Sequence, residues 1–295
     1  MRITKISYKT QRIILISAFL LVPLALLSTF ALYPALKLLF YSFTSFNGLT
    51  NVYPWVGIHN YIEIFSNPSL FGVFLHNLSY FIGGLVQNVL ALVLALFLSS
   101  KVRFRNGFRA ILFVPYILNS VAIVYIFQYL YQDPGVLDMV LKFVGLGALQ
   151  ADWIGNDKLV NWSLAFVSLW EFLPFTMVIY LAALQSLPRD MYESAVLDGA
   201  GAWQTFRFIT LPNLRSIIQI NLLLTVSGAL ESFNIPFIMT NAAPGAATFL
   251  TQTMNVAFVF DNYGLASAMA VVLVAIVVIV ISIQRKLIGQ GDDVV

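Results

Sequence analysis

Six apolar runs, each long enough to cross a membrane, constrain the fold of this chain more than any other feature. They cover residues 13–36, 73–99, 108–131, 161–184, 215–238 and 264–284. A helix needs about 20 mostly apolar residues to cross a hydrocarbon core of roughly 30 Å. In lipid, backbone amides must be satisfied within the segment, which favours helices. We therefore expect an all-α membrane protein with six transmembrane helices, forming a single domain over residues 1–295.

The composition excludes most soluble and catalytic classes. The chain is 60% hydrophobic and 10% charged, which is too apolar for a soluble domain. It has no cysteine and only two histidines, His59 and His76. Disulfides, thiolate metal sites and a cysteine nucleophile are therefore excluded, and two histidines are too few for a metal site of their own. We expect no catalytic residues, no metal site and no cofactor in this chain.

Basic residues gather on one side of the predicted topology, as they do in the cytoplasmic segments of membrane proteins. The N-terminus, the second and fourth connections and the C-terminus hold Arg2, Lys5, Lys9, Arg12, Lys101, Arg103, Arg105, Arg109, Arg189, Arg207, Arg215, Arg285 and Lys286. Only Lys37, Lys142 and Lys158 fall on the other side. We expect both termini in the cytoplasm. The net charge of +3 reflects this bias and does not indicate nucleic-acid binding.

Helix-breaking residues occur within several of the predicted spans. They are Pro23, Gly83, Gly84, Pro115, Pro174 and, near the end of the fifth span, Pro236. Membranes tolerate such residues where neighbouring helices or a water-filled cavity satisfy the freed backbone groups. A solute pathway would supply a cavity, and ordinary kinks between packed helices are the alternative. In the outer connection 132–160, the apolar run 136–144 is long enough for a short surface helix.

A charged segment, residues 187–214, separates the fourth and fifth spans on the predicted cytoplasmic side. With Ser186 as its N-cap, a helix should begin here and end at Gly199, which adopts the left-handed conformation readily. A second short helix is expected over 201–208, and Thr210 should then cap the fifth span. These two helices form a helix-turn-helix.

The polar face of this segment is acidic. It carries Asp190, Glu193 and Asp198. An amphipathic helix resting on lipid headgroups would favour Lys and Arg instead. The small side chains of Ser194, Ala195 and Ala200 permit close approach by another protein. The segment is therefore interpreted as a docking element for a cytoplasmic partner.

This segment resembles the coupling loop of ATP-binding cassette (ABC) importer permeases, in particular of the sugar-transport branch. The resemblance is carried by Glu193, Ser194, Ala195, Asp198, Gly199, Ala200, Ile209, Leu211 and Pro212. Residues 55–61 (WVGIHNY), 104–115 (FRNGFRAILFVP), 133–135 and 263–271 (YGLASAMAV) also resemble segments of that branch. Before the last span the chain departs from the usual Gly-Gly-Pro, with Ala242, Ala243 and Pro244 instead.

The resemblance implies partners that supply what this chain lacks. It implies that Glu193, Ser194, Ala195, Asp198, Gly199 and Ala200 dock into a groove of a cytoplasmic ABC ATPase, present in two copies. Because the chain has no G-x-x-x-x-G-K-[ST] loop, ATP and Mg would be bound by that partner. A second permease subunit, expected to be a different chain, an extracytoplasmic solute-binding protein and a bacterial or archaeal cytoplasmic membrane complete the expectation.

Ionisable residues within a membrane are costly and by default indicate a pathway. Glu171 and Glu231 are the two such residues, although each could instead be protonated and bonded to a neighbouring helix. Further polar and aromatic candidates are Asn119, Tyr125, Gln128, Tyr129, Trp170 and Asn234. Asn88, Gln219 and Asn221 are expected instead to form hydrogen bonds between helices.

Together these features predict the permease subunit of an ATP-driven importer that moves a sugar or oligosaccharide by alternating access. The alternative within this class is another small polar solute, glycerol-phosphate-like or a polyamine. An ion-coupled secondary transporter with Glu171 or Glu231 as its proton site is a different hypothesis, but it leaves the segment 187–214 without a role. No nucleophile and base suited to a membrane enzyme are recognisable.

Overall fold

The computed structural model describes residues 7–50, 52–100 and 103–288. Within these ranges the chain is helical, and the sole β-type pairing is an isolated bridge between Thr44 and Trp55. Three of the basic residues used to predict orientation, Arg2, Lys5 and Lys101, lie outside the described residues.

Five helical stretches are long and apolar enough to cross a membrane, and a bent pair makes a sixth if it counts as one span. Tyr8–Tyr41 comprises α1 (Tyr8–Leu27), the π-helix η1 (Ser28–Leu32) and α2 (Tyr33–Tyr41). Pro68–Ser99 comprises α4 (Pro68–Phe71), the 3-10 helix η2 (Gly72–His76) and α5 (Asn77–Ser99). The others are α9 (Val160–Ser186), α13 (Arg215–Leu230) with α14 (Asn234–Thr240), and α16 (Tyr263–Ile288).

The third predicted span is not one straight helix. The run expected over 108–131 consists of α6 (Arg105–Ile117) and α7 (Ser120–Leu130), bent by 93°. Asn119 has an extended backbone, and its Oδ1 accepts the N–H of Val121 at 2.9 Å, which makes it the N-cap of a new helix. Side-chain capping of this kind competes with continuation of the preceding helix.

Residues outside the spans form short helices. They are α3 (His59–Ser66), α8 (Val136–Phe143), the 3-10 turn η3 (Gly147–Leu149), α10 (Arg189–Leu197), α11 (Ala202–Thr205), the π-helix η4 (Phe206–Thr210), α12 (Leu211–Asn213) and α15 (Phe249–Phe258). Helix α8 matches the surface helix expected at 136–144. Its Asp138 is buried and accepts a hydrogen bond from the indole Nε1 of Trp153 at 3.0 Å.

By packing, the chain divides into two units. One unit comprises the chain up to Ile64 together with Val256–Val272, and the other comprises Phe65–Asn255 and the chain from Leu273 onwards. The division concerns contacts only, so a single permease domain stays a prediction. In the first unit Asn60 Nδ2 donates to the carbonyls of Ser42 and Thr44, each at 2.9 Å, and thereby fixes the turn after α2.

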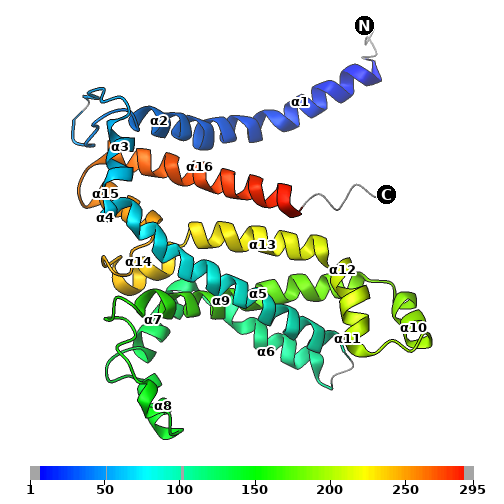
Figure 1. Ribbon diagram of the computed structural model, residues 1–295. Helices are drawn as coiled ribbons and strands as arrows, with labels where there is room; N and C mark the ends of the chain where they lie inside the picture. Colours follow the sequence, from blue (N-terminus) through cyan, green and yellow to red (C-terminus); the bar gives the residue numbers. More distant parts are fainter. Residues whose placement is uncertain (1–6, 51, 101–102, 289–295) are drawn as a thin grey trace. The chain divides into compact units, whose positions relative to one another are not determined.

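In the second unit α5 packs along α9, with α13 beside them (Figure 1). One core cluster places the small side chains of Ala91 and Ala95 on α5 against Met177 and Tyr180 on α9. Such small residues let helices approach closely in a membrane, where dispersion contacts favour association. Helices α5, α9 and α13 are thus held as one packed group, which positions the polar residues described below.

Candidate functional site

The charged segment between the fourth and fifth spans forms the predicted pair of helices, but with different boundaries. Ser186 is the last residue of α9, and its hydroxyl donates to the Ala183 carbonyl at 2.8 Å, so it does not cap α10. Helix α10 begins after Pro188, whose extended backbone separates it from α9. The capping prediction for Ser186 was therefore wrong, because the long apolar helix α9 extends through that residue.

The turn that follows α10 is built as the sequence predicts. Gly199 is left-handed, with φ of +78°. The N–H of Ala200 donates to the Ala195 carbonyl at 2.9 Å, closing the end of α10. This is the arrangement by which a glycine satisfies the last carbonyls of a helix. Gly201 then starts α11, its N–H donating to Gln204 Oε1 at 2.8 Å.

The second short helix extends further than the 201–208 expected. Helices α11, η4 and α12 run on to Asn213, so Thr210 lies inside this stretch and does not cap the fifth span. Thr210 is buried, and its hydroxyl lies 3.2 Å from the hydroxyl of Tyr192 on α10. That contact ties the two halves of the segment to each other.

The six coupling residues predicted from the sequence lie together around this turn. Glu193, Ser194, Asp198 and Gly199 are exposed, Ala200 is half-buried and Ala195 is buried. Two apolar side chains that the sequence analysis did not single out are also exposed: Leu197 at 87% and Trp203 at 72%. Both are large, and Leu197 directly precedes Asp198 in sequence. Only the fold shows that neither is covered.

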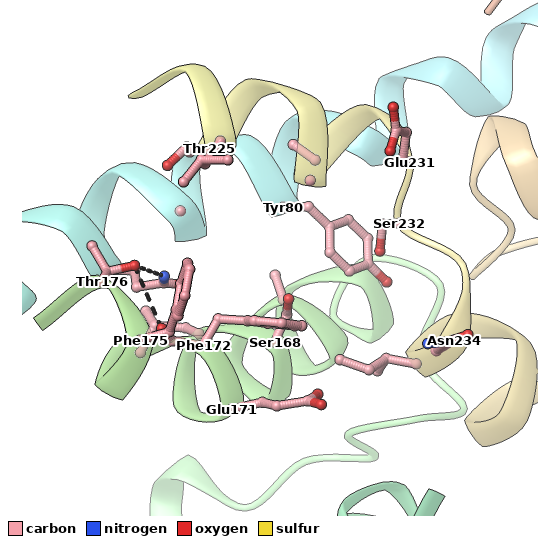
Figure 2. A pocket seen from close by; sticks show the side chains of 18 of the residues that line it. Tyr80, Ser168, Glu171, Phe172, Phe175, Thr176, Thr225, Glu231, Ser232 and Asn234 are labelled. Atoms are coloured by element: carbon pink, nitrogen blue, oxygen red, sulfur yellow. Dashed lines mark hydrogen bonds between the residues drawn. The ribbon is translucent and has the colours of Figure 1, made fainter. Parts of the chain in front are cut away.

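A cavity of about 390 Å³ lies among α5, α9 and α13, at the level where the fifth span is interrupted. Figure 2 shows Glu171, Phe172 and Phe175 on α9 facing it, with Tyr80 of α5 beside Ser232. A volume of this size lies within the range of roughly 300–1,000 Å³ typical of small-molecule sites.

The interruption of the fifth span is stabilised from two sides. Between α13 and α14 the residues 231–233 are not helical. Asn77 Nδ2 donates to the Ala229 carbonyl at 2.7 Å, and Thr248 Oγ1 donates to the Ser232 carbonyl at 2.6 Å. Carbonyls released by a broken helix are thus satisfied within the protein, as they must be at membrane depth.

Several polar groups in the cavity lack partners. Glu171 is buried, and its one hydrogen bond among the described residues comes from Ser120 Oγ, at a long 3.4 Å to Oε2. The Tyr80 hydroxyl faces Ser232, and the Asn221 side chain faces Tyr180, in each case without a hydrogen bond of ordinary geometry. Within the described ranges, no group of three or more acidic or histidine side chains is placed to hold a metal ion.

Comparison with known proteins places the chain among transport proteins. Residues 87–290 match the family described as "Binding-protein-dependent transport system inner membrane component". The chain belongs to this family. It is therefore a multi-pass component of the inner, or cytoplasmic, membrane, and we refer to it below as the permease.

The permease is similar to known proteins over most of its length. It is 30% identical to the probable ABC transporter permease protein YurN of Bacillus subtilis, covering 92% of this chain and 96% of that one. It is 30% identical to the multiple sugar-binding transport system permease protein MsmF of Streptococcus mutans, covering 91% and 93%.

Among solved structures, a chain of a bacterial ABC transporter involved in import of the acidic polysaccharide alginate superposes with a TM-score of 0.83. The two chains are 20% identical, over 96% of the permease and 98% of the other chain. At this identity, the likeness shows that the fold is shared.

The permease brings together three of the eight pathway candidates predicted from its sequence. Glu171, Glu231 and Asn234 line the cavity, and Figure 2 labels all three. The remaining five lie elsewhere. Trp170 packs on Phe127, with ring centroids 5.3 Å apart. Tyr125 and Tyr129 are exposed on α7.

The other two candidates are engaged with backbone. Asn119 caps α7, and Gln128 Nε2 donates to the Met239 carbonyl at 3.4 Å. Asn88, expected to join helices, does so: its Nδ2 donates to Thr225 Oγ1 at 2.6 Å and its Oδ1 accepts from Tyr180 at 2.9 Å.

The sequence analysis missed two residues of the cavity. Tyr80 was not singled out, because one tyrosine in a span of an aromatic-rich chain carries no signal. Asn221 was expected to bond a neighbouring helix, and its side chain does interact with Tyr180 of α9, but its place in the cavity wall was not predicted. Both were polar residues within a predicted span, which is the one sequence feature that could have drawn attention to them.

Proposed function

We propose that the permease is the membrane subunit of an ATP-driven importer for a sugar or oligosaccharide. The observation that carries the ATP-driven part is the exposed turn at Gly199, where acidic and apolar side chains stand uncovered. The carbohydrate part is supported by relatives. These include the trehalose/maltose transport system permease protein MalF of Thermococcus litoralis and the diacetylchitobiose uptake permease NgcF of Streptomyces coelicolor, at 28% and 31% identity.

The coupling segment would dock into the ATPase through residues of both kinds. Glu193 and Asp198 offer acidic groups, and Leu197 and Trp203 offer apolar area of the kind that dominates binding energy at interfaces. Because Tyr192 contacts Thr210 across the segment, movement of α10 would be transmitted toward α13. In this arrangement ATP and Mg are bound by two ATPase subunits and not by the permease.

The orientation and the remaining partners follow from the same scheme. Both termini and the coupling segment would lie in the cytoplasm, in keeping with the distribution of Lys and Arg. A second permease subunit, a different chain, would complete the membrane part. An external solute-binding protein is supported by the alginate transporter solved in complex with an alginate pentasaccharide-bound periplasmic protein, at 20% identity and a TM-score of 0.80.

The cavity is the proposed solute site, and alternating access would open it to each side in turn. Broken helices beside a buried polar cavity are a recurring way to expose backbone groups to a solute in a membrane. Here the break follows α13, and α13 is also joined through α12 to the coupling segment. A displacement of that segment would therefore be transmitted along α13 to the cavity wall.

A second candidate cargo is a small polar osmolyte. The osmoprotective compounds uptake permease protein GgtC of Synechocystis is 30% identical over 86% of this chain. The permease thus has a relative whose name refers to osmoprotective compounds and not to a sugar.

The test is solute-stimulated ATP hydrolysis in the complete complex, reconstituted in lipid nanodiscs with a panel of solute-loaded binding proteins. We expect stimulation by a carbohydrate, and loss of most of it in Glu193→Lys, because the variant reverses a charge at the docking turn. Asp157→Lys, a charge reversal at another exposed residue outside the coupling segment, should leave stimulation intact. If an osmolyte stimulates and no sugar does, the second candidate replaces the first. Full stimulation in Glu193→Lys would contradict the docking assignment.

A further inference from the structure

The cavity has unsatisfied hydrogen-bonding capacity that indicates a ligand rich in hydroxyl groups. Tyr80 is 5% exposed and Asn221 is 2% exposed, yet neither the Tyr80 hydroxyl nor Asn221 Nδ2 makes a hydrogen bond of ordinary geometry, although Ser232 and Tyr180 lie near them. Buried polar groups rarely lack a well-aligned hydrogen bond, so each of the two can take a further partner from a ligand. A hydroxyl both donates and accepts, and can therefore satisfy either residue.

The charged side chains that line the cavity are all acidic among the described residues. Glu171 is buried in its wall, and Glu231, which is exposed, also lines it. The described residues that line the cavity include no Lys, Arg or His. A carboxylate on a solute would therefore meet at least one carboxyl group of the protein and no compensating cation. Where these carboxyl groups are ionised they repel that carboxylate strongly, because like charges juxtaposed in a desolvated site are unfavourable.

Aromatic rings complete the lining. Phe172 and Phe175 lie three residues apart on α9, so they project from a similar face of the helix. Both line the cavity (Figure 2). Both keep more than a third of their surface exposed. Flat apolar rings suit the C–H faces of a sugar ring, while the unpaired polar groups suit its hydroxyls.

We propose that Glu171 excludes anionic carbohydrates from this cavity, so that the permease transports uncharged sugars and rejects uronic acids. This inference rests on the proposed function, import of a carbohydrate through this cavity. It separates the permease from the alginate importer, which shares its fold and is described as importing an acidic polysaccharide. The shared fold does not determine the charge of the cargo, whereas the lining residues do.

The experiment measures direct sugar binding to the complete complex in nanodiscs, without the solute-binding protein. The probes are maltose, cellobiose and chitobiose, each paired with the analogue in which one C6 hydroxymethyl group is oxidised to a carboxylate. Affinities come from competition titrations followed by saturation-transfer NMR. We expect at least one neutral disaccharide to bind, and its uronic acid analogue to bind roughly 100-fold more weakly.

Variants then assign the effect to its residue. Glu171→Gln keeps the shape and removes the charge, so it should retain affinity for the neutral sugar and reduce the gap to its analogue at least about tenfold, as one buried charge repulsion is removed. Glu63→Gln, the same change outside the cavity, should leave the gap unchanged. Equal or tighter binding of the uronic acid by wild type, no binding of any neutral sugar, or a gap that survives in Glu171→Gln would each overturn the proposal.

Failure of this inference can be distinguished from failure of the proposed function. The wild-type comparison needs no variant, so misfolding of Glu171→Gln cannot hide the answer. If a uronic acid-loaded binding protein stimulates ATP hydrolysis, the permease remains a carbohydrate importer and the exclusion of anions is wrong. If no carbohydrate-loaded binding protein stimulates hydrolysis, the proposed function itself is wrong.

Discussion

The side-chain amide of Asn77 donates a 2.7 Å hydrogen bond to the carbonyl of Ala229, 152 positions further along the chain. Asn77 begins α5, and Ala229 lies in the last turn of α13, directly before the non-helical residues 231–233. The Oδ1 of the same side chain accepts the backbone N–H of Phe249 at 3.2 Å. One buried residue therefore fixes the point at which the fifth span is broken and the cavity opens.

Replacing Asn77 should destabilise the permease. Asn77→Ala leaves the Ala229 carbonyl and the Phe249 amide buried without partners, which should cost about 1–3 kcal/mol. In its protonated form Asn77→Asp keeps a donor for the Ala229 carbonyl and an acceptor for the Phe249 amide, so its loss of stability should be smaller than that of Asn77→Ala. Thermal unfolding in nanodiscs measures both. Asn47→Ala, in an exposed turn, is the control, and an Asn77→Ala melting temperature equal to that of the control would contradict this role.

Gly84 marks a close approach of α5 and α13. A Cβ at Gly84 would lie 2.5 Å from Thr225 Cγ2, and Thr225 cannot easily rotate because Asn88 donates to its Oγ1 at 2.6 Å. Gly84→Ala should therefore cost about 1–3 kcal/mol through overpacking. The loss of stability is measured by thermal unfolding.

The neighbouring glycine and a compensating change make this prediction specific. At Gly83 an added Cβ meets Ala165 Cβ at 3.4 Å, so Gly83→Ala should cost much less. Thr225→Ser removes the obstructing methyl group and keeps the hydroxyl, and should restore most of the stability of Gly84→Ala. Additive losses in the double variant would show that the contact is not the cause.

We predict that backbone strain at Gly199 impairs function more than it impairs stability. Gly199 and Gly145 have φ of +78° and +81°, and at neither would an added Cβ meet an atom within 4 Å. Alanine costs about 1–2 kcal/mol in this conformation at either position. We expect Gly199→Ala to lower solute-stimulated ATP hydrolysis about fivefold or more, since 1 kcal/mol shifts an equilibrium by roughly that factor. Gly145→Ala, after α8, should lower stability equally and leave stimulation unchanged.

The bend in the third span should depend on the cap at its apex. Asn119→Ala removes the acceptor for the Val121 N–H and should cost about 1 kcal/mol, whereas Asn119→Asp, which retains a side-chain acceptor, should cost little. Chemical denaturation in detergent micelles would measure the difference. Equal losses in the two variants would indicate that the side-chain oxygen is not what stabilises the bend.

The features that could be predicted from the sequence are those that depend on a few neighbouring residues. The five long spans, and the bent pair α6 and α7, were found because length and apolarity are properties of single segments. Gly199 was assigned its turn because a helix that ends beside a charged linker needs a residue able to adopt positive φ. The caps assigned to Ser186 and Thr210 failed, because both residues also fitted inside a longer helix and sequence pattern alone does not rank those states.

The sequence by itself determined that this protein is a polytopic helical membrane protein with an acidic turn at Gly199, since hydropathy and turn chemistry act over a few residues. Only the tertiary structure decided that Tyr80, Glu171 and Asn221 line one cavity. Each stands on a different helix, and their meeting depends on the close packing of α5, α9 and α13 and on the break after Leu230. Contacts between side chains so far apart in the chain arise from packing across helices, which no single segment encodes.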